Sequence, residues 1–173
     1  FINNDFPCKF KAKIRLTGDL WWHLDWRNGH PVSSLHVEIL DGHVNSITKF
    51  KLLLPKSRNG KNEVFTSSIL KEVGFLAPRT FMVKSKINGL NVNYIFQEDL
   101  RKEFLENLKL REGPILEGDE RFTIMVTNEK DQPRINLSKI VNKRYLLKND
   151  SNARTALSSV SNLNLIYLQH HQM

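Results

Sequence analysis

The residues most able to do chemistry stand on either side of one turn. Lys49 and Lys51 belong to an alternating stretch that predicts a β-strand, and Glu63 follows at the start of a predicted helix. A lysine on a strand can pair with an anionic group, and an acid on a neighbouring helix can pair with a lysine. Two plainer interpretations stay open: the helix dipole favours a glutamate in the first turn, and both lysines can point to solvent.

The stretch from Phe50 to Glu112 contains the elements that must position these residues. Its apolar pattern predicts, in order, a strand, a helix, a hairpin and a second helix. Asn88-Gly89 is the strongest short signal for a hairpin turn, and Gly74 is a residue type that ends helices. The predicted ranges are Phe50 to Leu54, Asn62 to Val73, Phe81 to Ile87, Leu90 to Phe96 and Glu98 to Lys109.

Two more strands are predicted upstream. Lys9 to Leu16 alternates basic and apolar residues, which is typical of a half-buried antiparallel strand, and Ser34 to Leu40 also alternates. The turn Thr17-Gly18-Asp19 follows the first of them. We therefore expect an α+β fold, a small antiparallel sheet with a helix laid on it. The apolar stripe of that helix consists of Val64, Phe65, Ile69, Leu70 and Val73.

Several motifs, in this order and spacing, resemble the CotH kinase family, whose members look like highly diverged protein kinases. The resemblance covers roughly Lys11 to Phe122, and it implies a fold like the small lobe of a protein kinase. No single motif is specific by itself. The motifs are LTGD from Leu16, KFKLLLP from Lys49, EVGFLAPR from Glu72, ING from Ile87, QED from Gln97 and REGPIL from Arg111.

The resemblance also implies a set of site residues. Gly18 matches a turn that lies over nucleotide phosphates, Glu63 matches the acid on the helix, and Glu98 matches an acid near the adenine pocket. The implied cofactors are ATP and Mg²⁺ or Mn²⁺. Each residue has a structural alternative, because a lone glycine can serve only its turn and both glutamates can simply begin a helix.

Four positions depart from the family pattern. Val32 stands where relatives usually have a lysine, Asn93 where a glycine is usual, and Ile95 where a tyrosine is usual. Glu117 replaces a residue that is often lysine, and a reversed charge beside a phosphate would repel it. The missing lysine raises the alternative of a catalytically inactive relative.

The residues after the resembling part offer no catalytic motif. A strand is predicted from Phe122 to Val126, and a final helix from Ala153 to Leu168. Asp119, Asp131 and Asp150 are isolated in polar surroundings, which is typical of turn residues rather than of metal ligands. We therefore assign no catalytic acid and no metal ligand.

The chain opens on Phe1 rather than Met, and we expect it to be a fragment. Residues 1–126 are predicted to form the CotH-like lobe. Residues 127–173 are predicted to form a linker and a C-terminal helix, the start of a truncated second lobe.

Composition limits the classes of function. A chain of 173 residues with 40% hydrophobic residues suits one globular domain. The net charge of +8 indicates either an anionic partner or a lysine-rich solvated surface. Aromatic residues are not interleaved with the basic ones, which argues against nucleic acid. The single Cys8 excludes an internal disulfide, and no apolar run reaches the length of a membrane helix.

Three hypotheses follow. The first is the nucleotide-binding lobe of a CotH-like atypical protein kinase, which transfers phosphate from ATP to serine or threonine of a protein substrate. The second is an inactive binding or scaffold module of the same fold. The third is a basic α+β domain that binds a polyanion. The resemblance implies a bacterial cell envelope or extracellular location.

Overall fold

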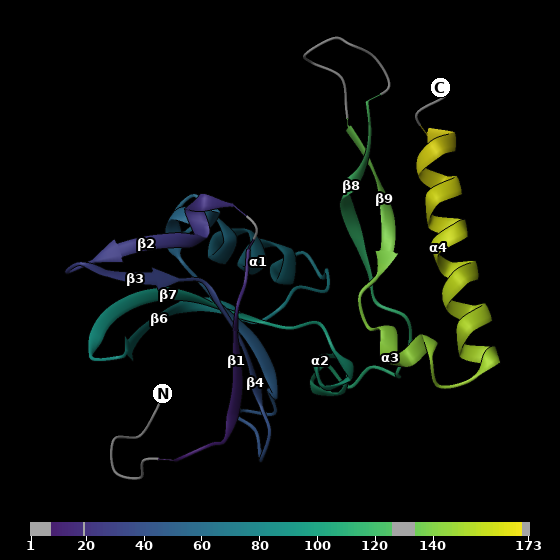
Figure 1. The fold of residues 1–173 in the computed structure, drawn as a ribbon. Helices are drawn as coiled ribbons and strands as arrows, with labels where there is room; N and C mark the ends of the chain where they lie inside the picture. The colour runs from purple at the N-terminus through teal and green to yellow at the C-terminus, as the bar shows by residue number, and fades with distance from the viewer. Residues whose placement is uncertain (1–7, 19, 126–133, 171–173) are drawn as a thin grey trace. The chain divides into compact units, whose positions relative to one another are not determined.

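The computed structural model describes residues 8–18, 20–125 and 134–170. They form two compact units that divide between Asp99 and Leu100 (Figure 1). The domain boundary predicted after residue 126 falls in 126–133, which lies outside the described residues.

The first unit is built on a five-stranded antiparallel sheet with the strand order β1-β4-β5-β7-β6. Helix α1, Asn62–Glu72, connects β5 to β6, as the sequence predicted, and the α+β class is confirmed. The strands are β1 Ala12–Leu16, β4 Leu35–Ile39, β5 Lys49–Leu53, β6 Thr80–Ile87 and β7 Leu90–Glu98.

A second, two-stranded ribbon precedes β4. It consists of β2, Leu24–Arg27, and β3, His30–Ser33, and it follows the short 3-10 turn η1, Trp21–His23. Another 3-10 turn, η2, covers Pro55–Arg58 after β5. Val32 of β3 is buried with Leu54 and other residues of the sheet, so the ribbon packs on the sheet rather than standing free.

Strand pairing lines up residues of one kind in rows across all five strands. Adjacent rows lie on opposite faces of the sheet because successive side chains of a strand alternate. We name the two sides the apolar face and the polar face after these rows, although the polar face also holds the buried Leu53 and Ile95. One row of the apolar face is Leu16, Leu35, Leu52, Phe96 and Phe81. The neighbouring row of the polar face is Arg15, His36, Lys51, Gln97 and Thr80.

The apolar face contains a main part of the core. Tyr94 and Val92 are almost fully buried beside Val32 and Leu54. The rings of Phe96 and Phe81 stack with centroids 4.6 Å apart, and Phe50 stacks on the other side of Phe96 at 4.8 Å. Burial of these large side chains contributes much of the free energy that stabilises the sheet.

Helix α1 lies against β6 through a polar contact instead of its apolar stripe. Ser67 is the buried residue of the helix, and its Oγ lies 3.2 Å from Thr80 Oγ1. Phe65 and Val73 of the predicted stripe are 67% and 61% exposed. The expectation that this stripe packs on the sheet is therefore wrong, because the Ser67–Thr80 contact turns the opposite side of the helix inward.

The second unit begins with α2, Lys102–Asn107, which starts later than predicted because β7 continues to Glu98, opposite Phe50. Phe104, Leu105 and Ile115 form its small core. The remaining elements are β8 Leu116–Met125, β9 Arg134–Ile140, α3 Lys143–Leu146 and α4 Asp150–His170. The strand β9, which pairs with β8, was not predicted.

The final helix was predicted as Ala153 to Leu168, and α4 contains that range. It lies beside β9, where the backbone N–H of Ser138 donates to Asn164 Oδ1 at 2.9 Å. In the described part of the chain, no helix combines the length and the apolar character needed to cross a membrane.

Candidate functional site

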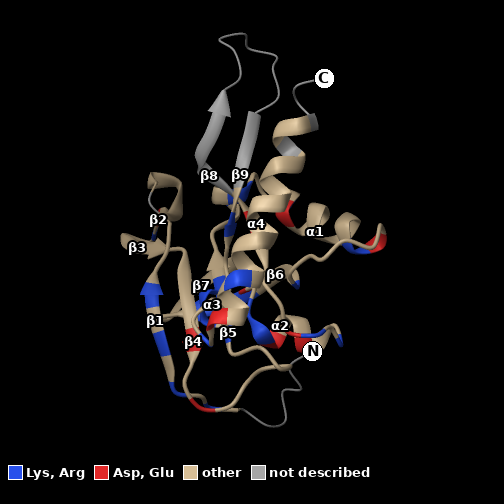
Figure 2. Cartoon of the chain, turned by 90° about the vertical axis from the view of Figure 1, so that its right-hand side faces the viewer, with Lys and Arg blue, Asp and Glu red and all other residues tan. Residues whose placement is uncertain are grey.

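The polar face has a connected set of charged side chains at its β1 edge. Arg15 Nε donates a 2.7 Å hydrogen bond to His36 Nδ1 on the neighbouring strand. His36 Nε2 lies 3.4 Å from Asp99 Oδ2, just after β7. Lys49 Nζ pairs with Glu38 Oε1 at 2.8 Å. Figure 2 shows basic residues along β1, so this edge of the sheet has positive charge available.

His36 is the buried centre of this set. Burial lowers its pKa, and the positive charges of Arg15 and Lys49 lower it further, whereas Asp99 acts to raise it. The imidazole is therefore neutral at pH 7. Since Nδ1 accepts from Arg15, the proton sits on Nε2 and faces Asp99. Nε2 makes no hydrogen bond within the described residues.

The two strand lysines have different surroundings. Lys49 has a side chain that is only 14% exposed and that pairs with Glu38, so the interpretation that it points to solvent is wrong. Lys51 is half-buried in the middle of the polar row, between His36 and Gln97 on the adjacent strands. Its ammonium group makes no hydrogen bond or ion pair with a described residue. Lys51 is therefore a cation of this row that can accept an external anion.

Glu63 lies over the same face, next to the neighbour of Lys51. Gln97 Nε2 donates a 2.6 Å hydrogen bond to Glu63 Oε1. Gln97 and Lys51 are direct cross-strand partners, and such side chains leave the sheet about 5 Å apart. The helix therefore brings its acid to Gln97 of β7, the cross-strand neighbour of Lys51. The pairing of Glu63 with a strand lysine stays a prediction.

Gly18 has a local structural reason to be glycine. It has φ of +94°, a conformation that other residues rarely adopt, and an added Cβ would lie 2.1 Å from Cγ of the His23 ring. His23 in turn contacts Ser34 Oγ at 3.0 Å. The structure thus places Gly18 at the end of β1 against His23.

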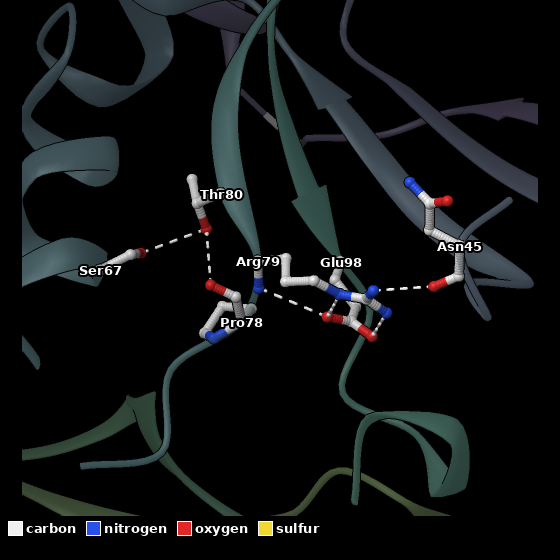
Figure 3. A network of polar contacts seen from close by, with 6 residues as sticks. All are labelled: Asn45, Ser67, Pro78, Arg79, Thr80 and Glu98. Carbon is white, nitrogen blue, oxygen red and sulfur yellow. Dashed lines mark hydrogen bonds and ion pairs between the residues drawn. The ribbon is translucent and has the colours of Figure 1, made fainter. Parts of the chain in front are cut away.

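Glu98 is on the other face of the sheet, and both of its carboxylate oxygens are used. Arg79 Nε donates to Oε2 and Arg79 Nη2 donates to Oε1, each at 2.8 Å (Figure 3). Arg79 Nη1 also donates to the carbonyl oxygen of Asn45 at 2.7 Å. The side chain of Glu98 is 3% exposed, and its hydrogen bonds raise the pKa of Arg79. This geometry makes Glu98 a structural anchor that joins β6, β7 and the loop before β5.

The three predicted residues are therefore not gathered in one hollow. Glu63 contacts Gln97, whereas Glu98 is the next residue of β7 and points to the opposite face. Gly18 lies beside His23 at the end of β1. The residues that do gather with Lys51 are Arg15, His36 and Gln97, which no motif singled out. Only the alternation of basic residues from Lys9 to Leu16 hinted at them.

Metal binding has no support in the described part of the chain, which contains no cluster of three or more histidine, cysteine, aspartate or glutamate side chains. Asp131, one of the isolated aspartates, lies outside the described residues. Asp150 is exposed in the first turn of α4, where a carboxylate suits the helix dipole.

In chemical terms, one row of the polar face offers two cationic groups, the ammonium of Lys51 and the guanidinium of Arg15. The carboxylate of Glu63 contacts Gln97 of the same row. That combination suits recognition of a phosphate-bearing anion rather than nucleophilic catalysis. No protein-family model and no curated protein matches the chain.

Proposed function

We propose that the first unit binds the phosphate groups of a nucleotide on the polar face of its sheet, as the nucleotide-binding lobe of a CotH-like atypical protein kinase. Lys51 contacts the phosphates, and Glu63 orients Lys51. The unpaired ammonium group of Lys51, beside the Gln97 that holds Glu63, is the observation that supports this most directly.

The charges around Lys51 fit such a ligand. Arg15 is exposed and uses Nε for His36, so its remaining N–H groups stay available to a phosphate oxygen. Glu38 is tied to Lys49, which limits its repulsion of an anion. Two cations on one face of a sheet attract a multiply charged phosphate chain more strongly than either alone.

Gly18 belongs to the proposal as the turn after β1, three residues beyond Arg15 of the polar row. Its positive φ is one that other residues rarely adopt, so its role here is to shape this turn. Glu98 contributes indirectly, because its two bonds to Arg79 hold the end of β7 where Gln97 presents Glu63.

Phosphoryl transfer to a serine or threonine hydroxyl would form a phosphoester and ADP, and a base would take the hydroxyl proton. Magnesium or manganese would neutralise charge on the transferred group. We assign the base and the metal ligands to no residue of this chain, so the proposal concerns nucleotide binding by Lys51 and Glu63.

Thermal unfolding with and without ATP and Mg²⁺ tests the proposal. At a concentration of about 100 times Kd, bound nucleotide stabilises by about 2.7 kcal/mol, which raises the Tm by roughly 5–10 °C. Lys51→Met should abolish this rise, and Glu63→Gln should reduce it. Lys84→Met, which removes an exposed lysine of β6, should leave it unchanged. Absence of any rise with the unaltered chain rejects nucleotide binding.

One observation favours the catalytically inactive alternative. Val32, at the position where relatives usually have lysine, is 5% exposed in the core with Leu54, Val92 and Tyr94. A lysine there would be buried without a partner, so this fold uses the position for packing. If ATP raises the Tm but radioactive γ-phosphate never reaches a protein substrate, the chain is a nucleotide-binding scaffold. Salt-sensitive binding to heparin without a response to ATP indicates a polyanion-binding domain instead.

A further inference from the structure

A pocket of about 450 Å³ opens on the apolar face, opposite the nucleotide site proposed above. Its walls come from β3, the end of β1, the start of β4 and the turn between β6 and β7. The lining residues are Leu16, His30, Pro31, Val32, Ser33, Leu35, Ile87, Asn88, Leu90 and Tyr94. This volume is in the range of small-molecule sites.

The lining is apolar and pre-formed. Val32, Leu35 and Tyr94 are at most 9% exposed, so they are held in place by the core whether or not a ligand is present. Leu16 at the rim is 74% exposed and would gain burial from a ligand. No lysine, arginine, aspartate or glutamate lines the pocket. A charged group bound here would lose its hydration without an ion partner, which is costly.

Three polar side chains of the pocket are free to bind. Those of His30, Ser33 and Asn88 make no hydrogen bond with a described residue. The hydroxyl of Tyr94, by contrast, already donates to the carbonyl oxygen of Ser33 at 3.0 Å. A few unpaired polar groups in an apolar pocket are what fixes the orientation of a bound small molecule.

We propose that this pocket binds an uncharged, mostly apolar small molecule that carries a hydrogen-bonding group, such as an aromatic amine or alcohol. The apolar walls supply affinity, and His30, Ser33 or Asn88 pairs with the polar group. The pocket and the nucleotide site lie on opposite faces of the sheet, so this inference does not depend on nucleotide binding.

Two fluorescent probes with one skeleton test the inference. N-phenyl-1-naphthylamine is uncharged, and 8-anilinonaphthalene-1-sulfonate adds a sulfonate. The uncharged probe should bind saturably at one site, at least 10-fold more tightly than the sulfonate. Amide chemical shifts in NMR spectra should change around Val32, Asn88 and Gly89. Equal affinity for the two probes, or shifts confined to other residues, overturns the proposal.

Matched variants locate the site independently. Leu16→Gln removes apolar contact at the rim and should weaken binding of the uncharged probe about 10-fold, the worth of roughly one buried leucine. Leu157→Gln alters a leucine of α4 that is 62% exposed, and it should leave the affinity unchanged. Both leucines are exposed, so both variants should keep the wild-type Tm. An equal loss of affinity for the uncharged probe in both variants contradicts binding in this pocket. Unchanged affinity in Leu16→Gln contradicts it as well.

Discussion

Two acids lie on opposite faces of the sheet at consecutive residues of β7. One is Glu98 itself, and the other is Glu63 of α1, which binds to Gln97. On the apolar face, Glu98 is buried and receives two charge-assisted hydrogen bonds from Arg79. On the polar face, Gln97 gives Glu63 one hydrogen bond from a neutral amide, and Glu63 is only half-buried. Glu63 can therefore exchange its hydrogen-bond partner for a ligand at little cost in free energy. Glu98 cannot.

The reason lies in desolvation. Removal of one partner from a buried ion pair leaves a charge that neither water nor protein stabilises, whereas a half-exposed carboxylate recovers hydrogen bonds from water. On the apolar face, the ion pair of Glu98 with Arg79 therefore stabilises the fold. The polar face keeps Lys51 and Glu63 in reach of solvent, where exchange of partners is possible.

Arg79→Met should have the largest effect, because it leaves Glu98 buried without its cation. We expect a loss of about 3–5 kcal/mol in the free energy of unfolding, measured with denaturant. The double variant Arg79→Met with Glu98→Leu should recover much of that loss, because no charge then remains buried. A double variant as unstable as Arg79→Met alone would show that the pair's charges do not explain the effect.

Low pH should destabilise the chain through His36 on the polar face. Its pKa in the folded state is below the ordinary value of 6.5, so the unfolded state binds more protons between the two values. The contribution to stability is therefore complete above pH 6.5 and falls as the pH drops from 6.5 towards the folded pKa.

This contribution is measured as the difference in unfolding free energy between pH 5 and pH 8. His36→Asn should show a smaller difference than the unaltered chain. Arg15, Lys49 and Asp99 face this imidazole, and their charges change the pKa of His36. An identical pH dependence in both proteins contradicts the assignment.

Gln97→Met should have the smallest effect on stability. It removes the single hydrogen bond to Glu63 while keeping the size of the side chain, and we expect a loss of about 1 kcal/mol or less. The same denaturant titration measures it. A loss as large as that of Arg79→Met would show that the acid of the polar face is as firmly held as Glu98, and would remove the distinction between the two faces.

Local signals in the sequence predicted several elements well. The alternation from Lys9 to Leu16 contains β1, although the predicted half-burial is wrong because all five residues of β1 are exposed. Asn88-Gly89 is the turn between β6 and β7, and the helix predicted from Asn62 begins there. These features depend on residues close in the chain. The strand β9 was missed because polar residues interrupt its apolar pattern, and pairing with β8 stabilises it regardless.

The candidate site was only partly predictable. Glu63 was singled out, and it contacts Gln97, the cross-strand neighbour of Lys51. The pairing of Arg15 with His36 joins residues 21 positions apart, and that of Arg79 with Glu98 joins residues 19 apart. Such contacts depend on strand register, which a sequence pattern does not specify. Glu98 was therefore assigned to a ligand although it serves Arg79.

By itself, the sequence determined most strands of the main sheet, helix α1 and the turn at Asn88-Gly89, because side-chain alternation and turn residues act over a few positions. Only the tertiary structure decided which faces those segments present to one another. A shift of register by one residue would exchange the polar and apolar rows, and burial of Leu35 and Phe96 in the apolar row favours the observed pairing. That pairing sets Lys51 beside Gln97, the partner of Glu63, and buries Glu98 with Arg79.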